Sequence, residues 1–396
     1  MNEQKMKILL VMTNMNTGGI ATAIRNMVHA LPGDRFQIDL LVFNNDNCED
    51  LLINGELKTA GKYMRLVSIS QSRSFKENLC LGLYRLLLGG ITKIFGHKIA
   101  YAELLRHTSS LKNEYDIAIS CTQSGPLRSL YGGCNEFVLA KVKAKEKISF
   151  IHCDYKTYGL DSKYSHEIYS LFDKIACVSE SVKRGFLECE PSFLDKTYVS
   201  INFQNYERIQ LLASESPVIY GDDRFHFATV ARFGNEKGHT RMLPIINELK
   251  EKGYAFTWHI IGGDLTNAPT EFVQAFHKYK LDEQIVFHGN QNNPYRFIKN
   301  VNLLLIPSYH EAAPMVYAEA HCLGVPILTT KTLSAVEMVE NEEIGIVCDN
   351  NDISIRDALE SILLNPSILS KYSVMSKQPD NKKAYDEFYK LIECEM

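Results

Sequence analysis

The segment "NLLLIPSYHEAAPMVYAEAHCLGVPILTT" (302–330) contains the parts of a strand–helix–strand unit. Two short apolar runs, at 302–307 and 326–330, flank a stretch with helical spacing. Pro314 can occupy the first helical turn, where its missing N–H costs nothing, and Gly324 can end the helix. Apolar strands joined by a helix pair in parallel, so the segment predicts a doubly wound α/β domain.

Within this helix, which is expected to end near Leu323, the spacing predicts a buried stripe of Val316, Ala320 and Leu323. Glu319 then projects from the flank of the helix toward the strand ends. Glu311 lies in the loop before the helix. An acid therefore stands on each side of the first helical turn.

The start of the helix can seat an anion, because the backbone N–H groups near Met315 and Val316 have no partner within the helix. Glu311 and Glu319 can accept hydrogen bonds from hydroxyl groups on either side of that anion. A ligand with sugar hydroxyls, phosphates and ribose hydroxyls fits this order. The alternative is a capping acid followed by a solvated helix glutamate.

Strand and helix patterns alternate along the whole chain and restart once, near residue 225. A chain of 396 residues is predicted to form two domains. The polar segment 203–224 is the expected linker. Strands are expected at 7–13, 36–43, 115–121, 147–152, 173–179 and 198–201 in the first half, and at 225–232, 256–263, 285–289, 302–307 and 326–330 in the second.

The composition, with 45% hydrophobic and 23% charged residues, is ordinary for a soluble globular enzyme. A net charge of −4 gives no overall attraction to nucleic acid. The ten cysteines form no C-x-x-C pair, which argues against a disulfide framework or a zinc site. The sequence shows no signal peptide and no apolar run of about 20 residues, so we expect a cytoplasmic protein, at most peripheral to a membrane.

The motif "EAAPMVYAE" (311–319) resembles the E-x7-E motif of retaining GT-B glycosyltransferases of family 4, glycosyltransferases group 1, of the bacterial cell-surface polysaccharide type. The resemblance implies two Rossmann-like domains whose parallel sheets face a central cleft. It also implies that Glu311 contacts the donor sugar and that Glu319 binds the ribose. The amides of Met315 and Val316 would hold the sugar and the diphosphate.

The same resemblance divides the chain into an N-terminal acceptor domain (1–203) and a C-terminal nucleotide-sugar donor domain (204–375). A final helix in 376–396 would cross back to the first domain, as in relatives. One departure lies at Ala313-Pro314, where many members have Phe-Gly. The close backbone approach that glycine allows is lost there.

A second motif, "ARFGNEKGH" (231–239), places Arg232 at the end of a strand and Lys237 just before a helix. Ligands of doubly wound sheets bind at that edge, and two cations there suit a diphosphate. The motif resembles the family's R-x4-K-G phosphate clamp. The alternative is a solvated turn with two unrelated cations.

The turn "TGGIATA" (17–23) resembles the family's N-terminal glycine loop, which implies that Gly18 and Gly19 border the donor diphosphate and the acceptor. A turn that simply needs glycine dihedral angles is the alternative. Relatives often have a glutamate after this pair, where this chain has Ile20-Ala21.

Two further segments resemble donor-domain turns. In "WHIIGGD" (258–264) a strand runs into Gly262, as in the family's G-x-G turn, although an ordinary strand-ending turn would look the same. The loop 288–297 resembles the one that passes the nucleotide base.

In "SFIHCDY" (149–155), His152 and Asp154 follow the end of a strand. The segment resembles the family position where a histidine contacts the donor sugar near its reacting carbon. His152 is thus expected to face the sugar, and Asp154 the acceptor side. A strand-end histidine with a purely structural role is the alternative.

Residues 73–112 combine apolar and basic side chains. A basic, apolar helix pair is typical of a segment that lies on an anionic membrane surface. The alternative is core-packed helices with snorkelling cations. The surface interpretation implies a lipid-linked acceptor and work at the inner face of the plasma membrane. The basic residues are Arg73, Lys76, Arg85, Lys93, Lys98, Arg106 and Lys112, against the acids Glu77 and Glu103.

Together these features predict a retaining transfer of a hexosyl unit from a nucleotide diphosphate sugar, UDP-linked, to a hydroxyl of a glycan acceptor in surface polysaccharide biosynthesis. Arg232 and Lys237 would stabilise the charge on the leaving diphosphate, with Glu311 and His152 on the sugar. No metal or other cofactor is expected, and the acidic segments "DNCED" (46–50) and "GDD" are interpreted as solvated turns. Two alternatives remain: a nucleotide-sugar epimerase of the same architecture and a non-catalytic partner subunit.

Overall fold

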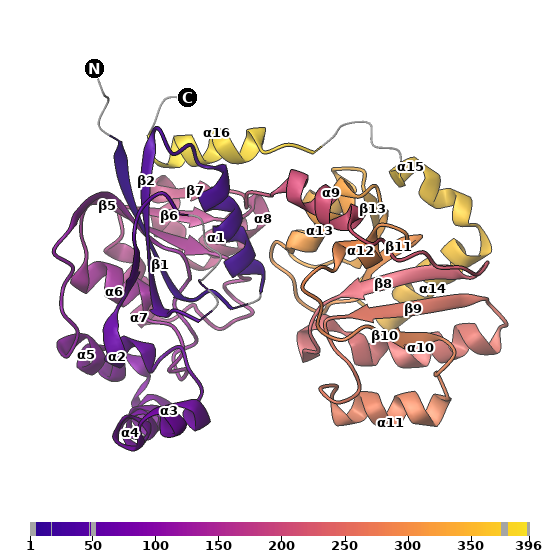
Figure 1. The fold of residues 1–396 in the computed structure, drawn as a ribbon, viewed down its shortest axis with the longest axis horizontal. Helices are drawn as coiled ribbons and strands as arrows, with labels where there is room; N and C mark the ends of the chain where they lie inside the picture. Colours follow the sequence, from indigo (N-terminus) through magenta and orange to yellow (C-terminus); the bar gives the residue numbers. More distant parts are fainter. Residues whose placement is uncertain (1–4, 17, 47, 49–52, 374–378, 394–396) are drawn as a thin grey trace. The chain divides into compact units, whose positions relative to one another are not determined.

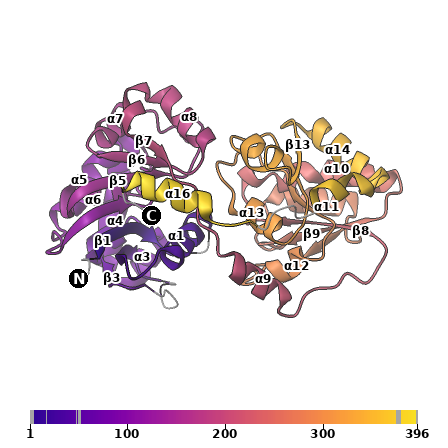
Figure 2. The same cartoon turned by 90° about the horizontal axis from the view of Figure 1, so that it is seen from above.

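The computed structural model describes residues 5–16, 18–46, 48, 53–373 and 379–393. The chain divides into two compact units, Met1–Gln204 with Asn381–Met396, and Asn205–Asp380. Each unit contains one all-parallel sheet flanked by helices (Figures 1 and 2). The prediction of two Rossmann-like α/β domains is confirmed.

The sheet of the first unit has seven strands in the order β3-β2-β1-β4-β5-β6-β7. Its central strands are buried on both faces, which is why they appear in the sequence as unbroken apolar runs. The strands are β1 (Met6–Asn14), β2 (Phe36–Asn44), β3 (Leu57–Thr59), β4 (Glu114–Ser120), β5 (Lys143–Ile151), β6 (Lys174–Cys177) and β7 (Thr197–Val199).

The helices of the first unit lie between these strands in the chain, except α16, which comes from the end of the chain. One hydrophobic core lies between strands β1, β2 and β4 and five of the helices, α2, α4, α5, α6 and α7. The helices are α1 (Gly19–Ala30), α2 (Gly61–Arg65), α3 (Gln71–Glu77), α4 (Leu79–Phe95), α5 (His97–Arg106), α6 (Cys134–Lys141), α7 (Lys163–Ser170), α8 (Glu180–Cys189), the 3-10 helix η1 (Pro191–Lys196) and α16 (Lys382–Leu391).

Helix α16 comes from the end of the chain but belongs to the first unit, beside β7 (Figure 1). Lys174 Nζ donates a hydrogen bond to the carbonyl of Leu391 at 2.8 Å. The hydroxyl of Tyr385 donates to the carbonyl of Ala30 at 2.6 Å. Of the segment predicted to cross back, residues 376–378 and 394–396 lie outside the described residues.

The sheet of the second unit has six strands in the order β10-β9-β8-β11-β12-β13. Helices α10, α11 and α14 pack on one face, and α12 and α13 on the other. The strands are β8 (Phe225–Val230), β9 (Phe256–Ile261), β10 (Ile285–Phe287), β11 (Leu303–Ile306), β12 (Ile327–Thr330) and β13 (Gly345–Cys348). The helical segments are α9 (Tyr206–Ser214), η2 (Asn235–Lys237), α10 (His239–Glu251), α11 (Thr270–Tyr279), α12 (Tyr295–Ile298), α13 (Met315–Cys322), the π-helical turn η3 (Val336–Glu340), α14 (Asp352–Leu364), η4 (Pro366–Leu369) and α15 (Ser370–Ser373).

The segment 203–224, which we predicted to be a linker, is mostly part of the second unit. Helix α9 occupies its first half, and Val218 N donates to the carbonyl of Arg296 at 3.0 Å. Asn205 caps α9 by accepting a hydrogen bond from the backbone N–H of Arg208. The polar composition that suggested a linker belongs to a capped surface helix and to the irregular segment after it, which binds to the second unit.

The two ends of α10 differ in how closely the backbone is approached. Gly238 has φ 71°, and a Cβ there would lie 2.0 Å from the carbonyl oxygen of Pro307. Gly253 has φ 81°, with nothing within 4 Å of a Cβ.

Gly253→Ala should therefore cost only the conformational penalty, about 1 kcal/mol of unfolding free energy. Gly238→Ala should cost clearly more, about 3 kcal/mol, in urea unfolding of the two variants; equal losses would refute the close approach.

Candidate functional site

Two loops meet at the carboxyl edge of the second sheet, one after β8 and one after its neighbour β11. Lys237 Nζ, on the first loop, lies 2.7 Å from Glu311 Oε1 on the second. Ser308 Oγ donates to the same oxygen at 2.8 Å. The side chains of Lys237 and Glu311 are only 24% and 11% exposed, so water screens this ion pair much less than a surface pair.

Arg232, the other predicted cation, is placed differently. Its side chain is 82% exposed, and its nearest acid is Glu236, whose Oε1 lies 3.5 Å from Nη2. A pair at this distance and exposure contributes little stability. The guanidinium can therefore turn toward an anion at the sheet edge at small energetic cost.

A buried arginine that the sequence analysis missed, Arg241, packs against the loop after β11 that carries Glu311. Arg241 donates to Asp352 and Asn350, both at 2.7 Å, and its guanidinium stacks 4.1 Å from the ring centre of Tyr309. The backbone N–H of Tyr309 donates to the carbonyl of Glu236 at 2.8 Å. These partners lie far apart in sequence, so no local pattern could reveal them.

Helix α13 begins at Met315, directly after its N-cap Pro314, and no side chain caps it. The predicted buried stripe is partly wrong. Ala320 is buried as expected, but Val316 and Leu323 are half-buried. The other buried positions of the helix are Met315, Tyr317, Glu319 and Cys322.

Glu319 is therefore buried rather than projecting from the helix flank. It is 8% exposed, and Tyr295 of α12 donates a hydrogen bond to its Oε1 at 3.3 Å. Burial raises the pKa of this carboxyl to about 7, against the smaller opposing effect of the Tyr295 hydroxyl. Near neutral pH the group can both donate and accept, which suits a pair of hydroxyls.

Gly262 ends β9 where backbone segments crowd together. Its φ is 112°, and a Cβ would lie 2.6 Å from the carbonyl oxygen of Ala231. Its N–H donates to the carbonyl of Gly289 at 2.8 Å. The site therefore needs glycine, because any side chain would push apart the loops that follow β8 and β9.

The remaining predicted residues belong to the first unit. Gly18 and Gly19, at the start of α1, are exposed, and a Cβ at Gly18 would meet nothing within 4 Å. His152 follows β5; its backbone N–H donates to Gln123 Oε1 at 3.1 Å, while its Nε2 is buried with no partner among the described residues. Burial lowers the pKa of His152 to about 4, so the ring is neutral at pH 7.

Asp154 caps a turn. Its two carboxylate oxygens accept hydrogen bonds from the N–H and the hydroxyl of Thr157, at 3.1 and 2.7 Å. These two hydrogen bonds give Asp154 a structural role in the turn. The acceptor-side role suggested for it has no support from these contacts.

Seven predicted residues thus gather in the second unit and four lie in the first, each set following strand ends of its own sheet. The second unit holds Arg232, Lys237, Gly262, Glu311, Met315, Val316 and Glu319; the first holds Gly18, Gly19, His152 and Asp154. Within the described residues, no three His, Cys, Asp or Glu side chains gather as metal ligands. Of the segment 46–50, Asp46 is bound by Arg73, whereas residues 47, 49 and 50 lie outside the described part.

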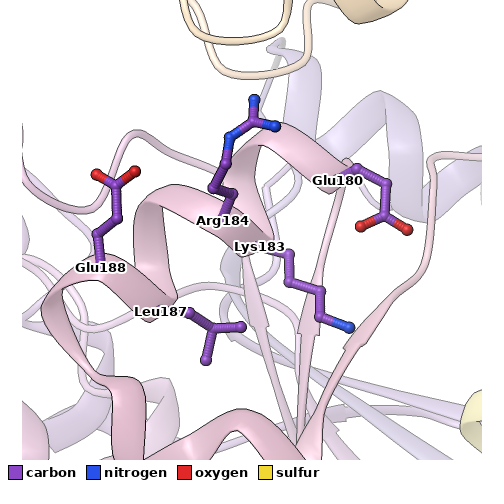
Figure 3. A pocket seen from close by; sticks show the side chains of 5 residues that line it. All are labelled: Glu180, Lys183, Arg184, Leu187 and Glu188. Carbon is purple, nitrogen blue, oxygen red and sulfur yellow. The ribbon is translucent and has the colours of Figure 1, made fainter.

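One surface pocket lies on α8 of the first unit. Figure 3 shows that Arg184 and Lys183 point in different directions, and acids accompany both. No predicted site residue lines this pocket, and its charges do not converge on one point. Its lining residues are Glu180, Lys183, Arg184, Leu187 and Glu188.

The solvent face of α4 is apolar. Residues 79, 83, 86, 87 and 94 share this face at helical spacing, while Leu88 and Thr92 on the opposite side are buried. Four of the seven basic residues of segment 73–112 are bound within the protein, namely Arg73, Arg85, Lys98 and Arg106. Lys93, on α4, has no ion pair among the described residues. The exposed fractions are Leu79 66%, Leu83 54%, Leu86 55%, Leu87 60% and Ile94 70%.

Comparisons with known proteins show which family this chain resembles. Residues 215–380 match the family model of the glycosyl transferases group 1. The capsular polysaccharide biosynthesis glycosyltransferase CapM of Staphylococcus aureus is 25% identical over 203 residues, which span 49% of this chain and about half, 53%, of CapM. The lipopolysaccharide 1,6-galactosyltransferase of Salmonella typhimurium is 23% identical, over 80% of this chain and 77% of that protein.

Solved structures show the same fold. Anabaena HepE in complex with UDP and glucose superposes with a TM-score of 0.67 at 15% identity, covering 98% of this chain and 99% of that one. The lipopolysaccharide glycosyltransferase WaaG gives a TM-score of 0.63 at 12% identity, covering 98% of each chain. The GT-B architecture expected from the sequence is confirmed.

The buried carboxyl of Glu319 predicts a pH-dependent stability. Its pKa is about 7 in the folded protein against 4.5 for the ordinary side chain, so the folded state holds the proton more tightly. Stability should fall as pH rises from about 4.5 to 7 and stay lower above 7. Glu319→Gln removes this titration and should stabilise the second unit at pH 8 by up to about 3 kcal/mol, with no gain at pH 4.5.

Thermal unfolding at the two pH values measures this difference. The exposed Glu283→Gln serves as a control in the same unit and should change neither value. An equal effect of Glu319→Gln at both pH values would contradict the assignment.

Proposed function

We propose that this chain transfers a hexosyl unit from a UDP-sugar, with retention of configuration, to a hydroxyl of a glycan acceptor in surface polysaccharide biosynthesis; the match of residues 215–380 to the group 1 glycosyltransferase model supports this. Two relatives support this choice by name, one from capsule and one from lipopolysaccharide synthesis. The UDP and glucose in the HepE complex support the donor. The same comparisons favour transfer over an epimerase or a non-catalytic partner subunit.

The observation that carries the proposal is the pairing of Lys237 with Glu311 beside the exposed Arg232. Arg232 and Lys237 stabilise the charge that builds up on the leaving diphosphate. Glu311, released from Lys237 when the phosphates arrive, positions the sugar hydroxyls. The amides at the start of α13 hold the phosphates.

Glu319 and His152 complete the assignment. Glu319 binds the ribose diol through a carboxyl that is buried and hydrogen-bonded to Tyr295. His152 is neutral, and its buried Nε2 offers a lone pair to a sugar hydroxyl. The leaving phosphate, rather than a protein nucleophile, takes the acceptor proton. The two cations take the place of a divalent metal, so we propose that no metal is required.

Incubation with UDP-sugars, with and without glycan acceptors, tests this function. UDP release that depends on the acceptor supports transfer, whereas interconversion of the UDP-sugar without acceptor would establish an epimerase. Activity should persist in EDTA.

Arg232→Gln should lower kcat about 10²-fold or more, because the guanidinium acts on charge that appears only in the transition state. The control is Arg224→Gln. Arg224 directly precedes β8, at the opposite end of that strand from Arg232, and donates a hydrogen bond to the carbonyl of Glu283. Initial rates at saturating UDP-sugar measure both variants. Full activity of Arg232→Gln would remove Arg232 from the mechanism.

We also propose that the acceptor is lipid-linked and that the protein binds the inner face of the plasma membrane through α4. Five large apolar side chains on one solvent face are costly in water but stable in a lipid interface. Lys76 and Lys93 are exposed beside them and attract anionic headgroups. Among the described residues no helix is long and apolar enough to cross a bilayer.

Replacing Leu83, Leu86 and Leu87 with serine should weaken binding to anionic vesicles more than tenfold, because about 1 kcal/mol or more of interfacial transfer energy is lost per leucine. Vesicle flotation measures binding. The matched control replaces Leu171, Leu194 and Leu211, which are similarly exposed at the C-terminal end of α7, on η1 and on α9. Unchanged flotation of the α4 variant, or equal loss in the control, would contradict the surface assignment.

A further inference from the structure

Three histidines from neighbouring strands of the second sheet form one hydrogen-bonded row. His226 lies in β8, His259 in β9 and His288 directly after β10. His226 Nδ1 lies 3.0 Å from His259 Nε2, and His259 Nδ1 lies 3.0 Å from His288 Nε2. At the far end, His226 Nε2 lies 2.9 Å from Asp222 Oδ1. Every ring nitrogen but one is therefore committed to a neighbour in the row.

The carboxylate at one end fixes the direction of every hydrogen bond. Asp222 can only accept, and hydrogen bonds from the backbone N–H of Arg224 and from His226 lower its pKa. His226 therefore donates from Nε2, which leaves its Nδ1 to accept from His259. By the same step, His259 Nδ1 accepts from Nε2 of His288.

The histidine in the middle of the row, His259, is neutral and shielded. Burial, together with the neighbouring His288 and His226, lowers the pKa of His259 to about 3, and burial also lowers the pKa of His288. Tyr220 stacks on the rings of His226 and His259, at 4.6 and 4.3 Å between ring centres. Each neutral ring carries one proton, so the alternation of donors and acceptors holds along the row.

The row ends in an unused lone pair. His288 Nδ1 makes no hydrogen bond within the described part of the chain, and it is not among the buried unpartnered atoms, so it is accessible from outside. His288 is half-buried at the carboxyl edge of the sheet, where doubly wound domains bind nucleotides. Its ring lies 4.5 Å from Phe297 of α12, the helix whose Tyr295 contacts Glu319.

We propose that His288 Nδ1 accepts a hydrogen bond from an N–H or O–H of the bound nucleoside, and that Asp222, His226 and His259 are positioning residues that fix its tautomer. This inference rests on the proposed function, because it assigns a further contact to the nucleotide-sugar site. The chemistry needed is a hydrogen-bond donor such as the imino N–H of uracil or a ribose hydroxyl. The side chains in the row touch no substrate except at His288.

Nitrogen-15 spectra of the histidine rings test the tautomer directly. In the full-length protein, His288 should be a pure Nε2–H tautomer, and its Nδ1 resonance should shift when UDP is added. Asp222→Ala should give a mixture of tautomers and raise the Kd for UDP about fivefold to tenfold, the range of one lost hydrogen bond. His259→Phe, which keeps the ring under Tyr220 but cuts the row, should do the same.

The neighbouring exposed carboxylate provides the control, since Asp223→Ala should leave the tautomer and the Kd unchanged. Comparison of UDP with CDP separates the two donor groups: if the base N–H is bound, Asp222→Ala reduces the preference for UDP, and if a ribose hydroxyl is bound, both nucleotides weaken equally. A purely structural row would change unfolding temperature without these effects.

Two results overturn the inference. If UDP binds, by thermal shift, while the His288 Nδ1 resonance stays still, the nucleotide contact is wrong although the proposed function stands. If Asp222→Ala leaves both tautomer and affinity unchanged, the row positions nothing. Absence of binding by any nucleotide would overturn the proposed function and the inference together.

Discussion

The ion pair between Lys237 and Glu311 joins the loops that follow β8 and β11, which the backbone hydrogen bond from Tyr309 N–H to the carbonyl of Glu236 also links. Its strength comes from shielding, because Glu311 is almost buried and also accepts from Ser308. Removing either partner would leave a poorly solvated charge, which in such settings costs about 3–5 kcal/mol. The close approach at Gly238 and the support from Arg241 both depend on the loop geometry that this pair fixes.

The same pair shapes the proposed reaction. In the free protein Lys237 is neutralised by Glu311, so the second unit does not present two unpaired cations waiting for a diphosphate. In the proposed reaction, a phosphate that approaches Lys237 would compete with Glu311 and release its carboxylate to accept hydrogen bonds from sugar hydroxyls. On this proposal, phosphate binding and sugar positioning would be one coupled exchange, and a ligand with only one of the two groups would gain only part of the binding free energy.

The sequence predicts those features that depend on local pattern. Buried parallel strands give unbroken apolar runs, so the eleven strands proposed from sequence each overlap a strand of the structure, whereas β3 and β13 are short edge strands with weak patterns. The E-x7-E spacing and the Arg232–Lys237 loop identify the sheet edge because they lie within single strand–helix connections.

Features made by distant residues could not be predicted in this way. His226 lies in β8, His259 in β9 and His288 directly after β10, and only the sheet register brings them together. The stripe of α13 was wrong because periodicity assumes that an acid faces water, whereas Tyr295 of another helix covers Glu319. Helix α9 was mistaken for a linker because a capped polar helix has the composition of one.

The basic character of 73–112 is the most instructive case, because charge counted along a sequence is not charge available at a surface. Arg73 is held by Asp46 and Glu77, and Arg85 binds the carbonyl of Leu66 and the side chain of Gln71. These two arginines fasten α3 and α4 to the domain, and what remains outside is a mainly apolar face. Attraction to a bilayer through such a face depends on burial of leucine more than on charge, so salt should screen it only weakly. Arg73 and Arg85, which helped to suggest a membrane segment, thus fix α3 and α4 on the domain with the apolar face of α4 toward solvent.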